Sequence, residues 1–363
     1  MKNNYLYSVT DKALYDALNQ YKITSNHIVD MFLKRGVIVS KQTNKKVLAR
    51  NFCRYHHDYY DHQVIAEHLG IHPRKEKITS SFIESNSSKD DFWNAAEILK
   101  ESIIADNDQC NVYIDSDKII IDITYSSLHY DKSEFNQVVK KNANIEIVKS
   151  KDNSYIIRRP DNDQFDDYVS QIVEEIGKNG KIEKKEVSLF SVPDHNLRSK
   201  FFIDFVSILN DYKLRDVSDV FVFNPNSVDV DDINDFDNYD IPEIKRVSLK
   251  GKSVLDSQEL KDLFDKGFYI WRIRWTVEER LADPDIFEFE AQFSDIVHCC
   301  GLSYISKGYW KYKGNGEYNK GKSQLDNNQN SKFITLFENA ALDIMKAIHS
   351  EYKGVSQNEH SEE

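Results

Sequence analysis

The spacing of apolar residues near the start of the chain predicts a small helical module. Leu14 and Leu18 fall on one face of a helix that Thr10 would cap. A second helix would follow Thr24 or Ser25, because either side chain can accept a hydrogen bond from the first turn. Gly36 then predicts the end of that helix, since glycine takes a positive φ without a steric clash.

A second pair of elements follows Gly36. Val37–Val39 form a short extended segment, and Ser40 or Thr43 would cap a third helix. The apolar positions of that helix are Val47, Leu48 and Phe52. A fourth helix, capped by Asp61, would run through His68 or Leu69.

Basic residues cover much of the remaining surface of the third helix and the loop before it. They are Lys41, Lys45, Lys46, Arg50 and Arg54. A helix start offers free N–H donors to phosphate, and cationic side chains supply sequence-independent attraction to nucleic acid. The stretch RGVIVSKQTNKKVLARNF resembles the helix–extended loop–helix of SAP-type DNA-binding modules, and it also resembles part of a winged helix. The resemblance implies contact with DNA or RNA; the alternative is a small helical domain with a solvated basic face.

The rest of the chain alternates between strand and helix patterns and predicts an α+β protein with mixed or antiparallel sheets and packed helices. A Ser-rich polar stretch, Ile78–Asp90, and an acidic segment, Asp229–Asp240, are the expected boundaries. The predicted organisation is a basic helical module over 1–82, α+β domains over 90–226 and 242–352, and a disordered tail over 353–363. The last domain would contain an antiparallel meander and a final helix over Lys332–Tyr352.

Charge is distributed unevenly along the chain. Residues 1–82 hold thirteen Lys or Arg and seven Asp or Glu, a net charge of +6, whereas the 363-residue chain carries −12, so residues 83–363 carry −18. An acidic body would repel a polyanion and suit a basic partner protein. We therefore expect nucleic acid to bind to the basic N-terminal module, residues 1–82.

Composition excludes several classes of protein. No run of about 18 apolar residues occurs, so we expect no membrane partner. The first residues have no apolar signal core, and the four cysteines form no disulfide pattern, which together predict a cytoplasmic protein. No cofactor-binding motif is present. Gly321-Lys322-Ser323 ends like a phosphate-binding loop but has no glycine five positions before Gly321.

A histidine cluster is the first candidate metal site. His56, His57, Asp58 and His62 lie close together in sequence, and imidazole and carboxylate groups suit zinc or harder transition metals. His57-Asp58 resembles the dipeptide of metal-dependent HD phosphohydrolases, which also need His or Asp from other helices. The alternative interpretation is a set of surface and capping histidines.

Two carboxylate patterns are weaker candidates for metal chemistry. Asp122, Glu146 and Lys149 approach the Asp and Glu-x-Lys arrangement of restriction-type nucleases, but one extra residue would turn Lys149 to the other face of its strand. The acidic segment Asp229–Asp240 has clustered oxygens suited to Ca²⁺ but no EF-hand glycine or closing glutamate.

Paired charges in the last domain have two interpretations. Arg272 and Arg274 lie opposite Glu288 and Glu290 and would form cross-strand ion pairs on an exposed sheet face. They could instead flank a small-ligand pocket near the tryptophans.

Three functional hypotheses remain. The preferred one is a non-enzymatic nucleic-acid-binding or adaptor subunit of a multi-protein bacterial system, with antiviral defence as one such setting. The alternatives are a metal-dependent nuclease or phosphohydrolase, and a subunit that only binds other proteins.

Overall fold

The computed structural model describes residues 9–69, 75–106, 108–128, 134–150, 154–178, 180–209, 211–225 and 244–359. The chain divides into two compact units. The first unit comprises residues 1–75, 87–148 and 170–179, and the second comprises residues 76–86, 149–169 and 180–363.

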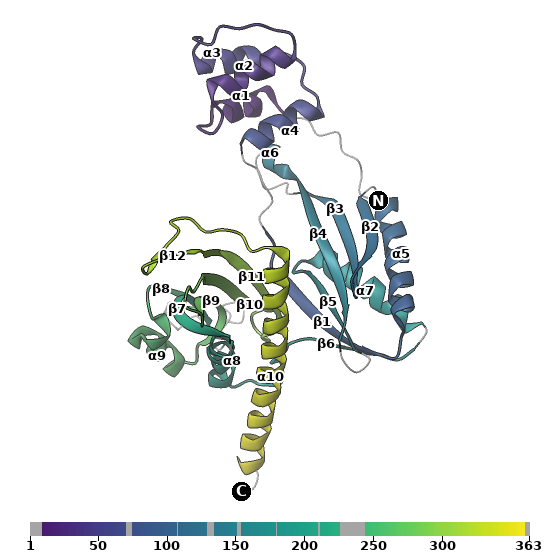
Figure 1. The fold of residues 1–363 in the computed structure, drawn as a ribbon, viewed down its shortest axis with the longest axis vertical. Helices are drawn as coiled ribbons and strands as arrows, with labels where there is room; N and C mark the ends of the chain where they lie inside the picture. Colours follow the sequence, from purple (N-terminus) through teal and green to yellow (C-terminus); the bar gives the residue numbers. More distant parts are fainter. Residues whose placement is uncertain are drawn as a thin grey trace, which may run out of the picture. The chain divides into compact units, whose positions relative to one another are not determined.

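Four short helices open the first unit and are drawn in purple to blue in Figure 1. They are α1 (Asp11–Asn19), α2 (Ser25–Lys34), α3 (Lys45–Phe52) and α4 (Tyr59–His68). The expected helical module is confirmed, and its core includes buried residues from all four helices. Residues 9–69 contain no strand, so the helix–loop–helix alternative fits this described segment and the wing of a winged helix does not.

The helix caps agree with the sequence in part. Thr10 caps α1 and Thr24 caps α2, as expected. The cap of α3 is Asn44, not Ser40 or Thr43, because the Asn44 side chain accepts from the backbone N–H of Lys46 at 2.9 Å. The cap of α4 is Asp58 instead of Asp61.

The remainder of the first unit is a three-stranded antiparallel arrangement with a long helix packed on it (Figure 1). Its elements are α5 (Lys89–Ala105), β2 (Gln109–Asp115), β3 (Lys118–Leu128), α6 (Glu134–Gln137) and β4 (Val138–Lys149). Ile119, Ile121 and Ile123 of β3 are buried on one face; on the opposite face Ile120 is also buried and Asp122 is exposed.

Helix α6 completes the core of the helical module. Phe135 is only 5% exposed and belongs to the same apolar cluster as α1–α4. Glu134 accepts hydrogen bonds from the backbone N–H of Thr10 at 2.7 Å and from its hydroxyl at 3.0 Å. A fragment ending near residue 82 would therefore lose part of the module's own core.

The second unit is built on a larger antiparallel sheet. Its strand order is β5-β1-β11-β10-β9-β7-β8, with β6 also paired to β1. The strands are β1 (Ile78–Ser85), β5 (Ser154–Pro160), β6 (Ile182–Lys185), β7 (Tyr212–Phe223), β8 (Arg246–Lys250), β9 (Tyr269–Glu279), β10 (Ile286–Asp295) and β11 (Cys300–Trp310). A separate hairpin joins β12 (Tyr312–Gly314) and β13 (Glu317–Tyr318).

Helices complete the second unit. They are α7 (Asp163–Gly177), which has residues in both units, α8 (His195–Ser207), η2 (Val254–Asp256), α9 (Gln258–Asp265) and α10 (Asn327–Glu359). Rings from α8, β9, β10 and α10 meet in the core, where Phe205, Trp275 and Phe337 are in mutual contact. The α+β class is confirmed. Helix α10 continues through Glu359, so the tail expected from residue 353 is helical up to that point.

Most of the Ser-rich stretch expected to be a polar boundary, Ile78–Ser85, is strand β1. It pairs with both β5 and β11. Its hydroxyls are buried because each finds an acceptor: Thr79 donates to the Leu302 carbonyl at 2.9 Å, and Ser80 donates to Glu338 at 2.7 Å. Paired hydroxyls carry little burial cost, so a strand can be polar in composition and still lie inside a sheet.

The expected ion pairs between β9 and β10 form, with the Arg272 and Arg274 side chains 26% and 28% exposed and their shared carboxylate buried. Glu290 is 2% exposed and accepts from Arg272 and Arg274, each at 2.9 Å. Lys77 of the second unit also contacts Glu290 at 2.9 Å. Glu288 pairs with Lys322 instead of an arginine. Burial opposes ionisation of Glu290, but hydrogen bonds from Lys77 and Arg274 outweigh it and lower its pKa to about 2.

We predict that Glu290→Gln lowers the free energy of unfolding of the second unit by about 3 kcal/mol or more, because the change leaves partly buried cations without their shared anion. Glu351→Gln is the matched control, since the Lys200–Glu351 pair is nearly half exposed and should contribute less than about 1 kcal/mol. Urea unfolding of the two variants measures the difference. Equal losses in both variants would contradict the prediction.

Candidate nucleic-acid interface

Helix α3 turns its apolar side into the module and its basic side outward. Leu48, Ala49 and Phe52 are at most 1% exposed. Lys46 and Arg50 are both exposed and lie four residues apart, so they share one face of the helix. Arg54 is exposed in the turn that follows the helix.

Four of the five predicted basic residues are exposed and carry no ion pair within the part of the chain that the structure describes. They are Lys41, Lys46, Arg50 and Arg54; we call them the α3 cations. Lys41 lies in the loop between α2 and α3, and the other three follow the exposed side of α3. Their charge is therefore not neutralised by the module's own described carboxylates.

Lys45 differs from the α3 cations. Its ammonium group donates to the carbonyl of Gln20, the C-cap of α1, at 2.6 Å. Partial burial lowers the pKa of Lys45. The Gln20 carbonyl also accepts from the backbone N–H of Ile23, and the added bond from Lys45 gives this lysine a role in holding α1 against α3.

Exposed apolar side chains accompany the basic residues. Val47 of α3 is 44% exposed, Tyr55 is 43% exposed, and Ile38 in the preceding loop is 89% exposed. Val37 and Val39 pack against the core on either side of Ile38, as an extended chain requires. Solvent-exposed Ile38 and Tyr55 can offer contact area to a ligand that the cations attract.

Arg35, which sequence reasoning did not single out, connects α2, α3 and α4. Its guanidinium pairs with Asp61 and donates to Nδ1 of His57 at 3.2 Å. It also lies over the Phe52 ring, 5.2 Å from the centroid. The His57 Nε2 atom is 2.9 Å from the Phe52 carbonyl. Because a carbonyl can only accept, Nε2 carries the proton and Nδ1 accepts from Arg35.

These contacts assign structural roles to most of the histidine cluster. Asp58 accepts from the backbone N–H of Asp61 at 2.9 Å and so caps α4. Both ring nitrogens of His57 are hydrogen-bonded, one to Arg35 and the other to the Phe52 carbonyl. His62 is 4% exposed and meets the Phe135 ring edge-on, whereas His56 is exposed. Among the described residues, no group of three or more His, Cys, Asp or Glu side chains is arranged to hold a metal ion.

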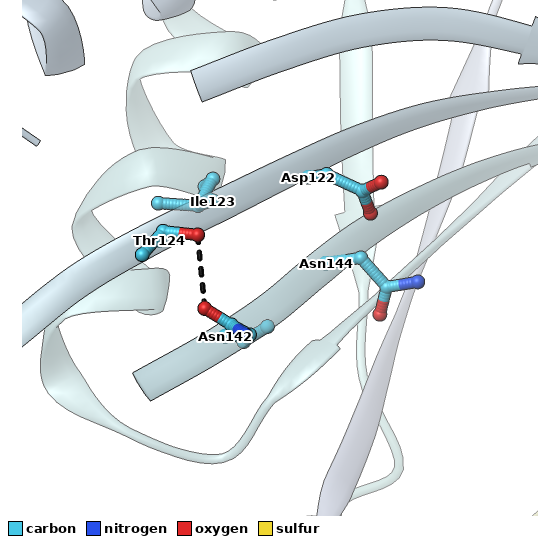
Figure 2. Close-up of a pocket in the computed structure, with 6 residues that line it drawn as sticks. Asp122, Ile123, Thr124, Asn142 and Asn144 are labelled. Carbon is cyan, nitrogen blue, oxygen red and sulfur yellow. Dashed lines mark hydrogen bonds between the residues drawn. The ribbon is translucent and has the colours of Figure 1, made fainter. Parts of the chain in front are cut away.

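The nuclease-like carboxylates lie on the polar face of β3 and β4. Asp122 pairs in register with Asn144, and Glu146 pairs with Ile120, so both acids face the same side. Lys149 alternates to the opposite side, and Glu146 is bound to Lys118 at 3.4 Å. A shallow hollow of about 390 Å³ lies over this face (Figure 2), where Thr124 donates to Asn142 at 2.9 Å.

Three further expectations from the sequence concern a phosphate-loop-like tripeptide, the acidic segment and membrane-spanning helices. Lys322 pairs with Glu288 and sits 4.6 Å from the Trp310 ring centroid, so Gly321-Lys322-Ser323 is used in packing. The acidic segment Asp229–Asp240 lies outside the described residues. No helix in the described part of the chain has the length and apolarity to cross a membrane.

No protein-family model matches the sequence, and a search of curated proteins finds no significant match. The proposal for function therefore depends on the geometry of this chain alone.

We predict that acid destabilises the helical module through its histidines. Burial, together with the charge of Arg35, outweighs the hydrogen bond to Phe52 and lowers the pKa of His57 below 6.5; burial also lowers the pKa of His62 and His68. The unfolded chain then binds protons more readily than the folded chain, so stability falls as the pH drops below about 6.5.

Pulse proteolysis in urea at pH 7.5, 6.5 and 5.5, monitored at cleavage sites within residues 9–69, measures this loss. His57→Gln should make the pH dependence smaller, because one of the titrating groups is removed. His56→Gln is the control, since His56 is exposed and should leave the dependence unchanged. A module equally stable at pH 7.5 and 5.5 would contradict the assignment.

Proposed function

We propose that this chain is a non-enzymatic nucleic-acid-binding adaptor subunit that contacts the phosphate backbone of DNA or RNA through Lys41, Lys46, Arg50 and Arg54. The observation that carries the proposal is the combination of exposure and lack of ion pairing at all four positions within the described chain. Cations free of protein partners can neutralise phosphates and release the counterions condensed on the nucleic acid, which supplies most of the affinity of sequence-independent contacts.

The rigidity of α3 supports the same proposal. Its buried side is held by Leu48 and Phe52, and its first turn is capped by Asn44. Lys46 and Arg50 therefore project from a fixed backbone, and binding does not have to order that helix. Lys45 contributes through its contact with Gln20, which keeps α1 and α3 together.

The adaptor part of the proposal rests on the charge of the remaining chain. Residues 83–363 carry −18, which suits a basic partner protein better than a second polyanion over most of their surface. A multi-protein bacterial system, for example one that acts in antiviral defence, is the setting we propose. Mass photometry of the chain mixed with the products of neighbouring genes tests it: a complex that dissociates at high salt supports the proposal, and failure of every neighbour to bind contradicts it.

We predict that the full-length variant with serine at all four α3 cations binds duplex DNA about 100-fold more weakly than the natural chain at moderate salt. Fluorescence anisotropy with labelled duplex DNA, and in parallel with duplex RNA, measures the change. The full chain is the proper material, because Phe135 belongs to the module's core.

The matched control carries serine at four exposed lysines of the second unit that also have no ion pair in the described chain. They are Lys252, Lys261, Lys311 and Lys320. Both variants lose four positive charges, so a loss of binding that comes only from net charge would be equal in the two. Equal binding by the natural chain and the α3 variant, or no binding by the natural chain, would refute the proposed role.

A further inference from the structure

The polar face of β9 holds more cations than the carboxylates beside them neutralise. Glu290 and Asp219 are the two acids at its centre, and five cations lie within 3.8 Å of one or the other. These cations are Lys77, Lys250, Arg272, Arg274 and Lys307. With a pKa lowered to about 2, Glu290 is already fully ionised near neutral pH and can supply no further negative charge. Asp161 also acts on Lys77, and even with this third carboxylate the five cations outnumber the acids.

The two arginines use their donors very differently. Arg274 directs Nε and Nη2 to Glu290, at 3.3 and 2.9 Å, and its Nη1 faces Asp219 at 3.6 Å. Arg272 pairs with Glu290 through Nη2 at 2.9 Å. Its Nε is buried and has no hydrogen-bond partner. A guanidinium has five N–H donors, so neither arginine uses all of its capacity, but Arg272 is the one with a buried N–H that has no acceptor.

A second buried donor lies beside Arg272 because the strand is irregular there. Phe221 of β7 pairs with Arg272, but the next residue, Val222, pairs with Ile270, so Trp271 is the extra residue of a β-bulge. Both Trp271 and Arg272 contact the Phe221 ring, with the guanidinium 4.5 Å from its centroid and the indole edge-on at 6.0 Å. The indole Nε1 of Trp271 is also buried without a partner.

We propose that Arg272 and Trp271 bind the phosphate group of a phosphorylated ligand, with Lys307 as a further cation at the site. A phosphate ester offers several oxygens that can accept from the unused N–H donors. Its one or two negative charges also balance part of the excess positive charge. Phe221 fixes the plane of the Arg272 guanidinium, and Arg274 with Lys77 positions Glu290. The phosphate can come from a free nucleotide or from a nucleic-acid strand.

The site is independent of the α3 cations, which belong to the other unit of the chain. Isothermal titration calorimetry on the full chain with three probes tests it: inorganic phosphate, AMP and a short oligothymidylate. The experiment is run in the background of the variant with serine at the four α3 cations, so that failure of the N-terminal interface cannot be mistaken for failure of this site.

We expect Arg272→Gln to weaken binding of the phosphate probe about tenfold or more, and Arg272→Lys to weaken it as well, because lysine keeps the charge but loses the guanidinium fork. Arg215→Gln is the matched control: Arg215 lies on β7 of the same unit and is 44% exposed, and its contacts are a 3.7 Å pair with Glu278 and the Tyr318 ring 5.3 Å away. It should bind as the parent does.

Trp271→Phe tests the site without depending on the folding of the arginine variants, because it removes the indole N–H and changes no charge. We expect this variant to bind the phosphate probe several-fold more weakly than the parent. Thermal unfolding verifies that each variant is folded. Binding of AMP identifies a free nucleotide as a sufficient source, and binding of the oligonucleotide alone identifies the strand; either supports the site. No binding of any probe at millimolar concentration, or binding unchanged by both Arg272→Lys and Trp271→Phe, overturns it.

Discussion

Burial of the apolar side of α3 is the constraint on which the proposed interface depends. Leu48, Ala49 and Phe52 have essentially no solvent exposure, so the rotation of α3 about its axis is set by the core. The cations at positions 46 and 50 can then face only outward. Arg35 adds a second restraint, because it ties Phe52 at the end of α3 to Asp61 at the start of α4. The basic surface is a consequence of how the core packs.

The two units use charge in opposite ways. In the helical module, the α3 cations are exposed and have no carboxylate partner in the described chain, which suits reversible contact with a polyanion. In the second unit, Glu290 is buried among cations and stabilises the sheet face. Regional net charge does not reveal this: a part of the chain that carries −18 overall holds a local excess of positive charge around Arg272.

Sequence periodicity predicted the elements whose apolar face is plain, including α1–α3, the antiparallel meander of the last domain and the final helix. It missed β1, because the burial of Thr79 and Ser80 depends on acceptors far along the chain, at Leu302 and Glu338. It missed Phe135 for the same reason, since nothing local places α6 in the core of the N-terminal helices.

The site was predictable to a similar degree. Spacing identified the exposed cations of α3, but it could not separate Lys45, whose partner is a backbone carbonyl in another helix. The histidine cluster suggested metal binding because His57 and Asp58 are adjacent. In the fold their side chains serve Arg35 and the start of α4, contacts that only the three-dimensional arrangement reveals.

The salt dependence of duplex DNA binding tests the central claim most directly. Each phosphate contact contributes a slope of about −0.9 to the plot of log affinity against log salt concentration for B-DNA. If the four α3 cations bind backbone phosphates, removing all of them should make the slope shallower by about 3 to 4. An identical slope for the natural chain and the variant would contradict the account, whatever their affinities at a single salt concentration.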